Sequence, residues 1–286
     1  MKVTVAATQY ACGPDIDANL DKAETIIRGA AASGANIILL QELFSTEFFP
    51  NFDWTPELFK FADTVERSKA IARIRSLAKE LGVVIPANFF ERDGQAYFNT
   101  NVIIDADGKD LGIYRKMHIP VGNASCYEKY FFSPGDKGFA VFDTAFGRIG
   151  CAVCWDQWFP ETARIMALKG AEMLFYPTAI GSNCHDHWQT AMCGHAASNI
   201  MPVIASNRIG AEDGKNHTTK FWGRSFITNH QGAVISKAQD EEGFIAATVD
   251  LEEARIARAD WGMFRDRRTD AYEELLTLDG HTRLAR

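Results

Sequence analysis

Three features that would assign this chain to other functional classes are absent from its sequence. Lys and Arg form no cluster of the kind found in nucleic-acid-binding proteins, and the formal net charge is −7. No apolar run is long enough to cross a membrane, and residues 1–9 resemble a first strand rather than a secretory segment. We therefore expect neither nucleic acid nor a membrane as a partner, and we expect a soluble, cytoplasmic protein.

Signals for disulfides and for linkers are also lacking. The 286 residues include only 6 cysteines, scattered along the chain, so free thiols in a reducing compartment are expected. No low-complexity stretch divides the chain, and 47% of its residues are hydrophobic, which is enough for a large core. These observations exclude a disordered chain or a small disulfide scaffold, and they favour one domain spanning residues 1–286.

The sequence does contain a regular alternation of strand-like and helix-like segments. Apolar residues at helical spacing predict helices over 16–32, 70–81, 160–168 and about 187–199. The expected strands are 3–9, 36–41, 83–90, 96–104, 111–116, 148–153, 173–176, 203–206, 223–228, 233–236 and 244–249, with Asp107-Gly108 as a hairpin turn and Pro177 as a strand stop. The pattern predicts an α/β fold with two similar halves, whose sheets are buried between helices or against each other.

Cys154 is the first candidate for a reactive residue. An apolar strand ends within 150–154, and Pro160 can open the next helix, so the thiol lies on a strand-to-helix elbow, where we expect it to be presented rather than packed. The helix just beyond would favour the thiolate, and a thiolate beside an acid–base group can attack an acyl carbon. The alternative is an inert buried cysteine, the usual state of this residue type.

Two other cysteine chemistries need to be weighed. Cys151 and Cys154 have redox CxxC spacing, but an offset of three along a strand points them to opposite faces, and a redox motif should open a helix. A zinc site would draw on Cys184, His185, His187 and either Cys193 or His195. It lacks a paired-cysteine knuckle, so neither alternative is favoured.

Three further charged residues can act with Cys154. Glu42 follows an apolar strand deep in the expected fold, where it is either a proton acceptor or a structural acid satisfied by backbone donors or an ion pair. Lys116 ends another strand and can stabilise an oxyanion, although alone it would pass for a surface lysine. Glu128 can steady Lys116 or orient substrate, or it is a solvated loop acid. Open α/β folds place chemistry at strand ends, where Glu42, Lys116 and Cys154 all lie.

These motifs, in this order, resemble those of the nitrilase superfamily, the carbon-nitrogen hydrolases. The matching segments are Leu40-Gln41-Glu42-Leu43-Phe44, Tyr114-Arg115-Lys116 with His118-Ile119-Pro120, and Cys154-Trp155-Asp156. Within the superfamily, 154–161, 174–182, 205–210 and 264–268 are most similar to the N-carbamoylputrescine amidases, enzymes of polyamine biosynthesis. The resemblance implies a four-layer α-β-β-α sandwich, a small amide or carbamoyl substrate, no metal or organic cofactor, and association through helices into homodimers or larger homo-oligomers.

The resemblance also implies roles for individual residues. Glu42, Lys116 and Cys154 would form a Glu-Lys-Cys triad, with Glu128 as a second active-site glutamate. Glu42 would accept the thiol proton, Cys154 would attack the carbamoyl or amide carbon, and Lys116 with the backbone N–H of Trp155 would hold the oxyanion. Hydrolysis of the cysteinyl thioester would complete the reaction, giving amine, carbon dioxide and ammonia from an N-carbamoyl amine.

Departures from the family pattern leave the substrate open. Met117 replaces a serine of the family pattern, and the segment 121–126 replaces an Asp-Gly-Pro-Gly-like turn. Only residues 183–185 separate Gly181-Ser182 from the Asp186-His187-Trp188 motif, where a longer, acidic segment is usual. The loss of acidic groups makes a more neutral or aromatic amide or nitrile the alternative substrate. A Cys/His zinc-binding or interaction module is the non-enzyme alternative. The candidate substrate contacts are Phe48, His118, Tyr127, Asn183 and His187.

The end of the chain is rich in charge. Residues 261–278 combine Arg265, Arg267 and Arg268 with Asp266 and Glu273. This composition is compatible with a solvated face, but we favour a packing role and expect the tail, about 261–286, to lie at a subunit contact.

Overall fold

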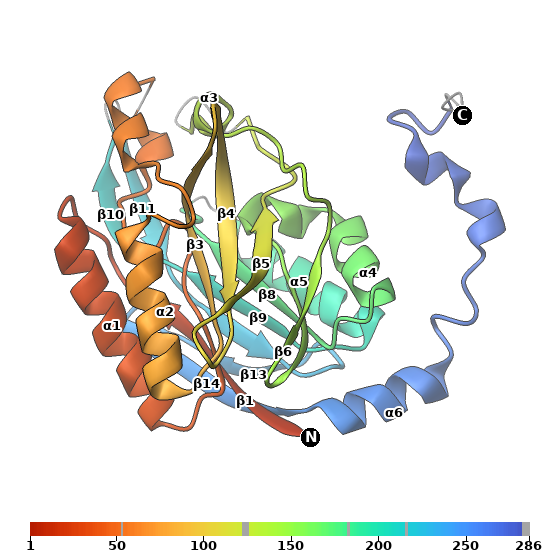
Figure 1. Ribbon diagram of the computed structural model, residues 1–286. Coiled ribbons are helices and arrows are strands. Elements are labelled where there is room, and N and C mark those ends of the chain that lie inside the picture. The colour runs from red at the N-terminus through yellow and green to blue at the C-terminus, as the bar shows by residue number, and fades with distance from the viewer. Residues whose placement is uncertain (53, 122–125, 182–183, 215–216, 282–286) are drawn as a thin grey trace.

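The protein is built around two β-sheets (Figure 1). The computed structural model describes residues 1–52, 54–121, 126–181, 184–214 and 217–281. In the first sheet the order is β14-β1-β2-β3-β4-β5, because a parallel bridge between Ile37 and Val84 joins two three-stranded ladders. The strands of this sheet are β1 (Lys2–Gln9), β2 (Ile37–Leu39), β3 (Ile85–Asp93), β4 (Ala96–Ile104), β5 (Asp110–Arg115) and β14 (Gly243–Asp250).

The second sheet is six-stranded with the order β13-β12-β9-β8-β7-β6. Its strands are β6 (Val141–Thr144), β7 (Gly147–Cys151), β8 (Met173–Thr178), β9 (Val203–Asn207), β12 (Phe226–Thr228) and β13 (Val234–Lys237). The central strands β7, β8 and β9 run parallel, and every residue of β8 and β9 is buried. Strands buried on both faces need cover on both sides, which explains their continuous apolar sequences.

Helices cover the outer face of each sheet (Figure 1). On the first sheet lie α1 (Ile16–Ala32) and α2 (Lys69–Leu81), and on the second lie α4 (Pro160–Leu168) and α5 (His185–Asn199). The two sheets pack face to face, so the layers are α-β-β-α and the predicted four-layer sandwich is confirmed. Asp15 begins α1 by accepting the backbone N–H groups of Asp17 and Ala18, as an N-cap residue does.

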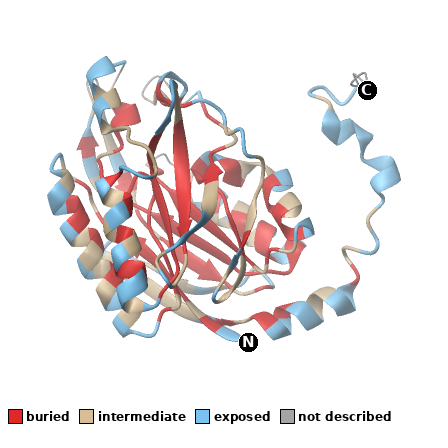
Figure 2. Ribbon diagram, viewed as in Figure 1, coloured by how far each residue is buried: buried red, intermediate tan, exposed pale blue. Residues whose placement is uncertain are grey.

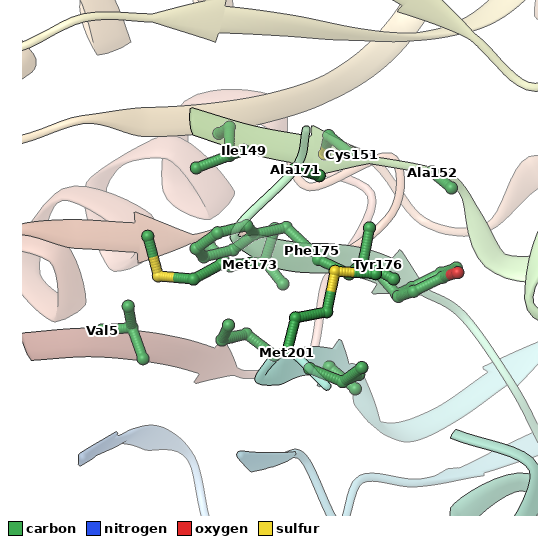
Figure 3. Close-up of a cluster of buried hydrophobic side chains, with 14 of the residues drawn as sticks. Val5, Ile149, Cys151, Ala152, Ala171, Met173, Phe175, Tyr176 and Met201 are labelled. Carbon is green, nitrogen blue, oxygen red and sulfur yellow. The ribbon is translucent and has the colours of Figure 1, made fainter. Parts of the chain in front are cut away.

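The largest hydrophobic core lies between the two sheets and extends to the inner faces of α4 and α5. Val5 of β1 belongs to the same cluster as Met173 and Phe175 of β8, as Figure 3 shows. A second cluster fills the space between the first sheet and the helices α1 and α2, through residues such as Leu20 and Ile74. Figure 2 shows the result, with buried strands inside and exposed residues on the outer helix surfaces.

The predicted elements are present, but the strands expected over 36–41 and 223–228 are shorter, at Ile37–Leu39 and Phe226–Thr228, and Pro177 differs from the expectation. The helices 16–32 and 160–168 and the strand 96–104 have the predicted bounds. Pro177 does not stop its strand, since β8 continues to Thr178 and pairs with β9. The pairing of β7 with β8 ends at Phe175, so the missing N–H of Pro177 falls where no neighbouring strand needs a donor.

Several elements of the structure were not predicted. They are the hairpin β10 (Ile209–Asp213) with β11 (Thr218–Trp222), the strand β6, the helices α3 (Glu128–Phe131) and α6 (Leu251–Trp261), and the 3-10 helices η1 (Phe49–Asn51), η2 (Pro56–Phe61), η3 (Cys154–Trp158), η4 (Thr269–Ala271) and η5 (Glu273–Leu276). The hairpin lies outside both sheets and so shows no clear alternation of buried residues. Helix α6 does have end signals, an Asp250 N-cap and a left-handed Gly262.

The segment after α6 leaves the body of the molecule. In Figure 1 residues 262–281 extend away from the sandwich, and in Figure 2 most of them are exposed. Leu275, Leu276 and Leu278 are all exposed there. No helix within the described residues combines the length and apolar character that a membrane span requires.

Candidate active site

Cys154 lies on a tight turn between β7 and α4. The strand ends at Cys151, and Cys154 opens η3 with a φ of 41°, a left-handed conformation that is unusual for a residue other than glycine. The buried carboxylate of Asp156 holds this turn, because its Oδ2 accepts the backbone N–H of Val153 at 3.0 Å and the hydroxyl of Tyr114 at 2.7 Å. The predicted elbow is therefore present, and a buried acid maintains its strained backbone.

The thiol of Cys154 is buried, whereas the sequence suggested that it would be presented rather than packed. The residue is only 7% exposed, and burial raises the pKa of its thiol well above the ordinary value. The charge of Glu42 raises this pKa further, whereas Lys116 and the backbone N–H of Ala179 lower it. The expected thiolate is thus wrong for the resting protein, and the thiol needs a proton acceptor before it can attack a carbon.

Lys116 is completely buried directly after β5. Its Nζ donates to Oε1 of Glu42 at 2.9 Å and to Oε2 of Glu128 at 2.5 Å. Burial opposes the charge of Lys116, but the carboxylates of Glu128 and Glu42 outweigh it, and the pKa of Lys116 is raised well above its usual value. Lys116 therefore remains a cation in the interior, which rules out the surface lysine considered above.

Glu42 occupies the loop after β2, and its two carboxylate oxygens have different surroundings. Oε1 accepts from Nδ2 of Asn99 at 2.8 Å and from Lys116. Oε2 is buried and has no hydrogen-bond partner among the described residues. A buried acceptor without a partner is costly, so Oε2 is available to take a proton.

Two sets of bonds bring Cys154 to this charged cluster. Asp156 Oδ1 accepts the backbone N–H of His118 at 2.9 Å, which ties the residue two positions after Lys116 to the residue two positions after Cys154. On the other side, the N–H of Glu42 donates to the carbonyl of Thr178 at 3.4 Å, next to Ala179. The electrostatic coupling of Glu42, Lys116 and Glu128 to the thiol agrees with this proximity.

Glu128 is the most unusual acid of the cluster. It begins the short helix α3 and is buried, and burial raises the pKa of its carboxyl to about 7. Lys116 lowers this pKa and Glu42 raises it, so the protonation states of the three groups are coupled. Glu128 is therefore a buried acid in contact with Lys116, and it is not a solvated loop acid.

Trp155 and His118, two other predicted site residues, belong to the surroundings of the Cys154 elbow. Trp155 is 38% exposed and is the second residue of η3, among the N–H groups that have no acceptor within a helix. His118 stacks on Phe159 with ring centroids 3.7 Å apart, and its Nδ1 lies 2.7 Å from Asp156. His118 thus supports the elbow.

Phe48 and His187 lie in different surroundings. Phe48 is buried in an aromatic cluster, in edge contact with Phe221, because the loop after β2 folds inward. His187 is exposed on α5, beside the ring of Trp158 at 4.7 Å. Asn183 lies outside the described residues.

Tyr127 lines an open depression of about 390 Å³. Its other walls are Trp54, Pro120, Val121, Cys126, Lys129 and Tyr130. Cys126 connects this depression to the charged cluster, since its Sγ is 3.8 Å from Oε1 of Glu128. An aromatic depression beside the cluster provides room for part of a small organic substrate.

The zinc and redox alternatives can be compared with the same geometry. Within the described part of the chain, no group of three or more His, Cys, Asp and Glu side chains is arranged to hold a metal ion. His185 instead contacts Asp186, and His195 contacts the carbonyl of Gln157. Cys151 accepts from Asn101 at 2.9 Å and lies in no disulfide.

Sequence reasoning assigned no role to several residues that hold the site. Glu42 is contacted by Asn99 and Arg208. The Cys154 elbow is contacted by Asp156 and Ala179, and the loop beside it by Asn207. The available signal was a run of polar residues in otherwise apolar segments, such as 99–101 in β4 and 206–208, which ends β9 and continues one residue beyond it, since buried polar groups need partners.

Comparisons with known proteins agree with this geometry. Residues 4–259 match the family described as carbon-nitrogen hydrolase. The chain is 50% identical over 293 residues to an N-carbamoylputrescine amidase of Arabidopsis thaliana, covering 98% of this chain and 97% of that one. It is 46% identical over 282 residues to a citrullinase of Francisella tularensis, covering 96% and 98%.

A solved structure of a carbon-nitrogen hydrolase has the same fold as this chain. A carbon-nitrogen hydrolase of Helicobacter pylori superimposes with a TM-score of 0.92 at 36% identity, covering 97% of this chain and 99% of that one. The prediction of a nitrilase-superfamily hydrolase is thereby confirmed. The chain belongs to the carbon-nitrogen hydrolase family.

Proposed function

We propose that this protein hydrolyses the terminal carbamoyl group of a small N-carbamoyl amine, through a covalent intermediate on Cys154. The observation that carries the proposal is the buried, unpartnered Oε2 of Glu42 in the same cluster as a thiol whose pKa is raised. A protonated thiol and a free carboxylate oxygen are the donor and acceptor that a general-base step requires. The names of the relatives at 50% and 46% identity, an N-carbamoylputrescine amidase and a citrullinase, support a carbamoyl substrate.

The first half of the reaction forms the covalent intermediate. Glu42 accepts the thiol proton as the sulfur of Cys154 attacks the carbamoyl carbon, and the carbonyl π electrons move to oxygen. Lys116 and the backbone N–H of Trp155 stabilise this oxyanion. When the carbonyl re-forms, the carbon–nitrogen bond to the terminal amino group breaks, Glu42 returns its proton, and ammonia leaves. The product is an S-carbamoyl cysteine.

The second half releases the enzyme. Glu42 takes a proton from water, and the resulting hydroxide adds to the S-carbamoyl carbon, again with the oxyanion beside Lys116. The carbon–sulfur bond breaks, and the sulfur of Cys154 recovers the proton from Glu42. The carbamic acid that leaves then loses carbon dioxide to give the amine. We propose that Glu128 keeps Lys116 charged and in place through both halves.

A more neutral or aromatic amide is the second candidate substrate. It is favoured by the depression beside the cluster, whose described walls include Trp54, Tyr127 and Tyr130 and contain one cation, Lys129. Aromatic walls contact a flat or apolar substrate group through its faces and edges. Nitrile hydrolysis would use the same cysteine but would release acid and ammonia without an amine.

An ammonia-release assay tests these candidates. The panel would contain N-carbamoylputrescine, citrulline, an N-carbamoyl aromatic amine, simple amides and nitriles, with intact-protein mass spectrometry to detect an adduct on Cys154. Cys154→Ala should lose both turnover and adduct. Cys151→Ala, which removes a buried thiol on the adjoining strand, should keep both. Undiminished turnover by purified Cys154→Ala protein would refute the mechanism.

We also propose that residues 1–286 form one catalytic domain that works as a homodimer or larger homo-oligomer, with the tail 261–286 at the subunit contact. The exposed leucines Leu275, Leu276 and Leu278 on a segment that leaves the sandwich support this, because exposed apolar side chains favour a protein partner. None of the six cysteines lies in a disulfide, which supports a reducing, cytoplasmic location.

A further inference from the structure

We propose that Asn207, the last residue of β9, and Arg208, which directly follows it, are positioning residues that hold the proton acceptor and the thiol in reacting geometry. The inference deepens the proposed function and rests on the roles given there to Glu42 and Cys154. It adds that both roles depend on one buried dipeptide that contacts neither the thiol nor the carboxylate oxygens.

Arg208 holds the backbone of Glu42 itself. The residue is completely buried, and its Nη2 donates to the carbonyl of Glu42 at 2.7 Å and to that of Leu43 at 3.1 Å. Its Nη1 donates to the carbonyl of Thr46 at 3.2 Å. One rigid guanidinium therefore binds three carbonyls of the loop after β2, a task for which its planar fork of donors is suited and a lysine is not.

The loop that Arg208 holds is strained. Leu43 has a φ of 48°, in the left-handed region that is unfavourable for a residue with a side chain. Its N–H donates to Oδ1 of Asn88 at 2.7 Å, while Arg208 binds its carbonyl. Strained backbone next to a reacting group persists only where surrounding bonds maintain it. Without Arg208, relaxation of Leu43 would rotate the neighbouring Glu42 and move Oε2.

The β10–β11 hairpin supplies the counter-charge for Arg208. Glu212 of β10 is buried and accepts from Nη1 of Arg208 at 2.5 Å and from the backbone N–H of Phe48 at 2.5 Å. The rings of Phe48 and Phe221 lie 5.8 and 5.4 Å from the guanidinium carbon. A buried cation needs an opposite charge and hydrogen-bond partners to offset its desolvation. The hairpin and Phe48 therefore support the side chain of Arg208 rather than the substrate.

Asn207 acts on the other side of the site. Its side chain accepts the N–H of Ile180 at 2.8 Å and donates to the carbonyls of Ile180 and Gly223, both at 3.1 Å. Ile180 directly follows Ala179, whose backbone N–H contacts the Cys154 thiol and lowers its pKa. The side-chain amide of Asn207 thus holds the loop after β8, which faces the sulfur.

Because Asn207 is the last residue of β9 and Arg208 directly follows it, the loop bearing Glu42 and the loop facing Cys154 are both held relative to the end of one strand. Proton transfer needs donor and acceptor within hydrogen-bond reach, and a displacement of about 1 Å can lower a rate about 100-fold. The dipeptide therefore affects the chemical step rather than substrate binding.

Arg208→Lys tests the proposal, with Arg258→Lys as the matched control. Arg258 is another arginine whose side chain binds two carbonyls, those of Ala171 at 3.2 Å and Ile200 at 3.1 Å, but it is only partly buried and lies on α6 outside the site. Each variant would be assayed for kcat and KM on the best panel substrate, and for melting temperature. The rate of iodoacetamide alkylation of Cys154, located by peptide mapping, would be measured from pH 6 to 10.

We expect Arg208→Lys to lower kcat about tenfold or more while KM changes less than about threefold, and to slow alkylation of Cys154 at pH 7 more than at pH 10. Arg258→Lys should leave kcat and the alkylation profile unchanged. A folded Arg208→Lys protein with the kcat and alkylation profile of the unmodified protein would overturn the proposal, as would equal losses in Arg258→Lys.

Two further variants and a substrate-free assay complete the test. If Arg208→Lys does not fold, Asn207→Ala and Glu212→Gln replace it, with the same expected and contrary results. The alkylation assay needs no substrate, so its failure differs from that of the proposed function. If no panel compound is hydrolysed but Glu42→Gln and Arg208→Lys both slow alkylation at pH 7, the carbamoyl substrate is wrong and the positioning role stands. If Glu42→Gln slows it and Arg208→Lys does not, the positioning role is wrong.

Discussion

Asn99 donates its side-chain N–H to Oε1 of Glu42 at 2.8 Å, the same oxygen that accepts from Lys116 at 2.9 Å. Both partners stabilise negative charge on one oxygen and leave Oε2 unoccupied among the described residues. The arrangement orients the carboxylate, so that the oxygen without a partner is the one available for proton transfer. Asn99 is itself held by Nδ2 of Asn88 at 2.8 Å.

Removing the Asn99 donor should therefore impair the chemical step. Asn99→Ala is expected to lower kcat by about 10- to 100-fold with little change in KM, because the carboxylate of Glu42 would rotate. Asn101→Ala is the matched control, since Asn101 is equally buried on β4 but bonds to Cys151. Steady-state kinetics checks the prediction, and a similar loss of kcat in both variants would contradict it.

Replacing the buried ammonium should affect the rate more than binding. Lys116→Met keeps the length of the side chain but removes the charge that faces the oxyanion, so kcat should fall about 100-fold or more. Single-turnover measurements with saturating substrate would separate this loss from any change in product release. A variant that raises KM and keeps kcat would show that Lys116 acts in substrate binding instead.

Activity should depend on pH near neutrality because of Glu128. The pKa of its carboxyl is raised to about 7, so the ionised form that pairs with Lys116 is lost as the pH falls through that value. We expect kcat/KM to decline on the acid side with an apparent pKa near 7 that belongs to the coupled cluster. In Glu128→Gln the maximum should be lower and this acid limb should move to lower pH. A limb at the same pH in the variant would assign it to another group.

The same raised pKa has a consequence for stability. A carboxyl with a higher pKa when folded binds its proton more tightly in the folded state, so its stabilising contribution is complete below about pH 4.5 and is lost as the pH rises through about 7. Urea unfolding of Glu128→Gln should therefore show a smaller decline in unfolding free energy between pH 5 and 8 than the unmodified protein. Equal slopes for the two proteins would be evidence against burial of an ionising Glu128.

The Cys154 elbow should depend on Asp156. Asp156→Asn replaces an acceptor with a donor among the N–H groups of Val153 and His118 and the hydroxyl of Tyr114. One or more of these donors would be left buried without an acceptor, and we expect a loss of about 2–4 kcal/mol in unfolding free energy. Chemical denaturation measures this loss, and unchanged stability would show that the network does not maintain the elbow.

The tail offers a test of assembly. Truncation after Arg268 keeps Phe264 in contact with Arg164 and Arg258, at 4.9 and 5.4 Å, but removes the exposed leucines. If the tail forms the subunit contact, light scattering should report a smaller particle for the truncated chain. Leu275→Ser with Leu276→Ser should act in the same direction, whereas Glu273→Gln with Glu274→Gln should not. An unchanged mass in the truncated chain would contradict the proposed contact.

The sequence by itself determined most of the helices and strands and the α/β class, and the resemblance to a known family implied the four-layer sandwich. Leu20, Ala23 and Ile27 recur at helical spacing, and that spacing places them on the buried face of α1. Local signals such as the Asp15 cap and the left-handed Gly82 set helix ends without reference to distant residues. The three motifs around Glu42, Lys116 and Cys154 likewise sufficed to indicate the family and a common site.

Only the tertiary structure decided the protonation states and supports of that site. The pKa of Cys154 depends on burial and on charges 38 and 112 positions away in the chain, at Lys116 and Glu42, and local sequence contains neither term. The contact of Arg208 with the carbonyl of Glu42 spans 166 positions. Motifs record which groups are present, whereas long-range packing determines which oxygen stays free, which thiol stays protonated and which buried cation holds the loop between them.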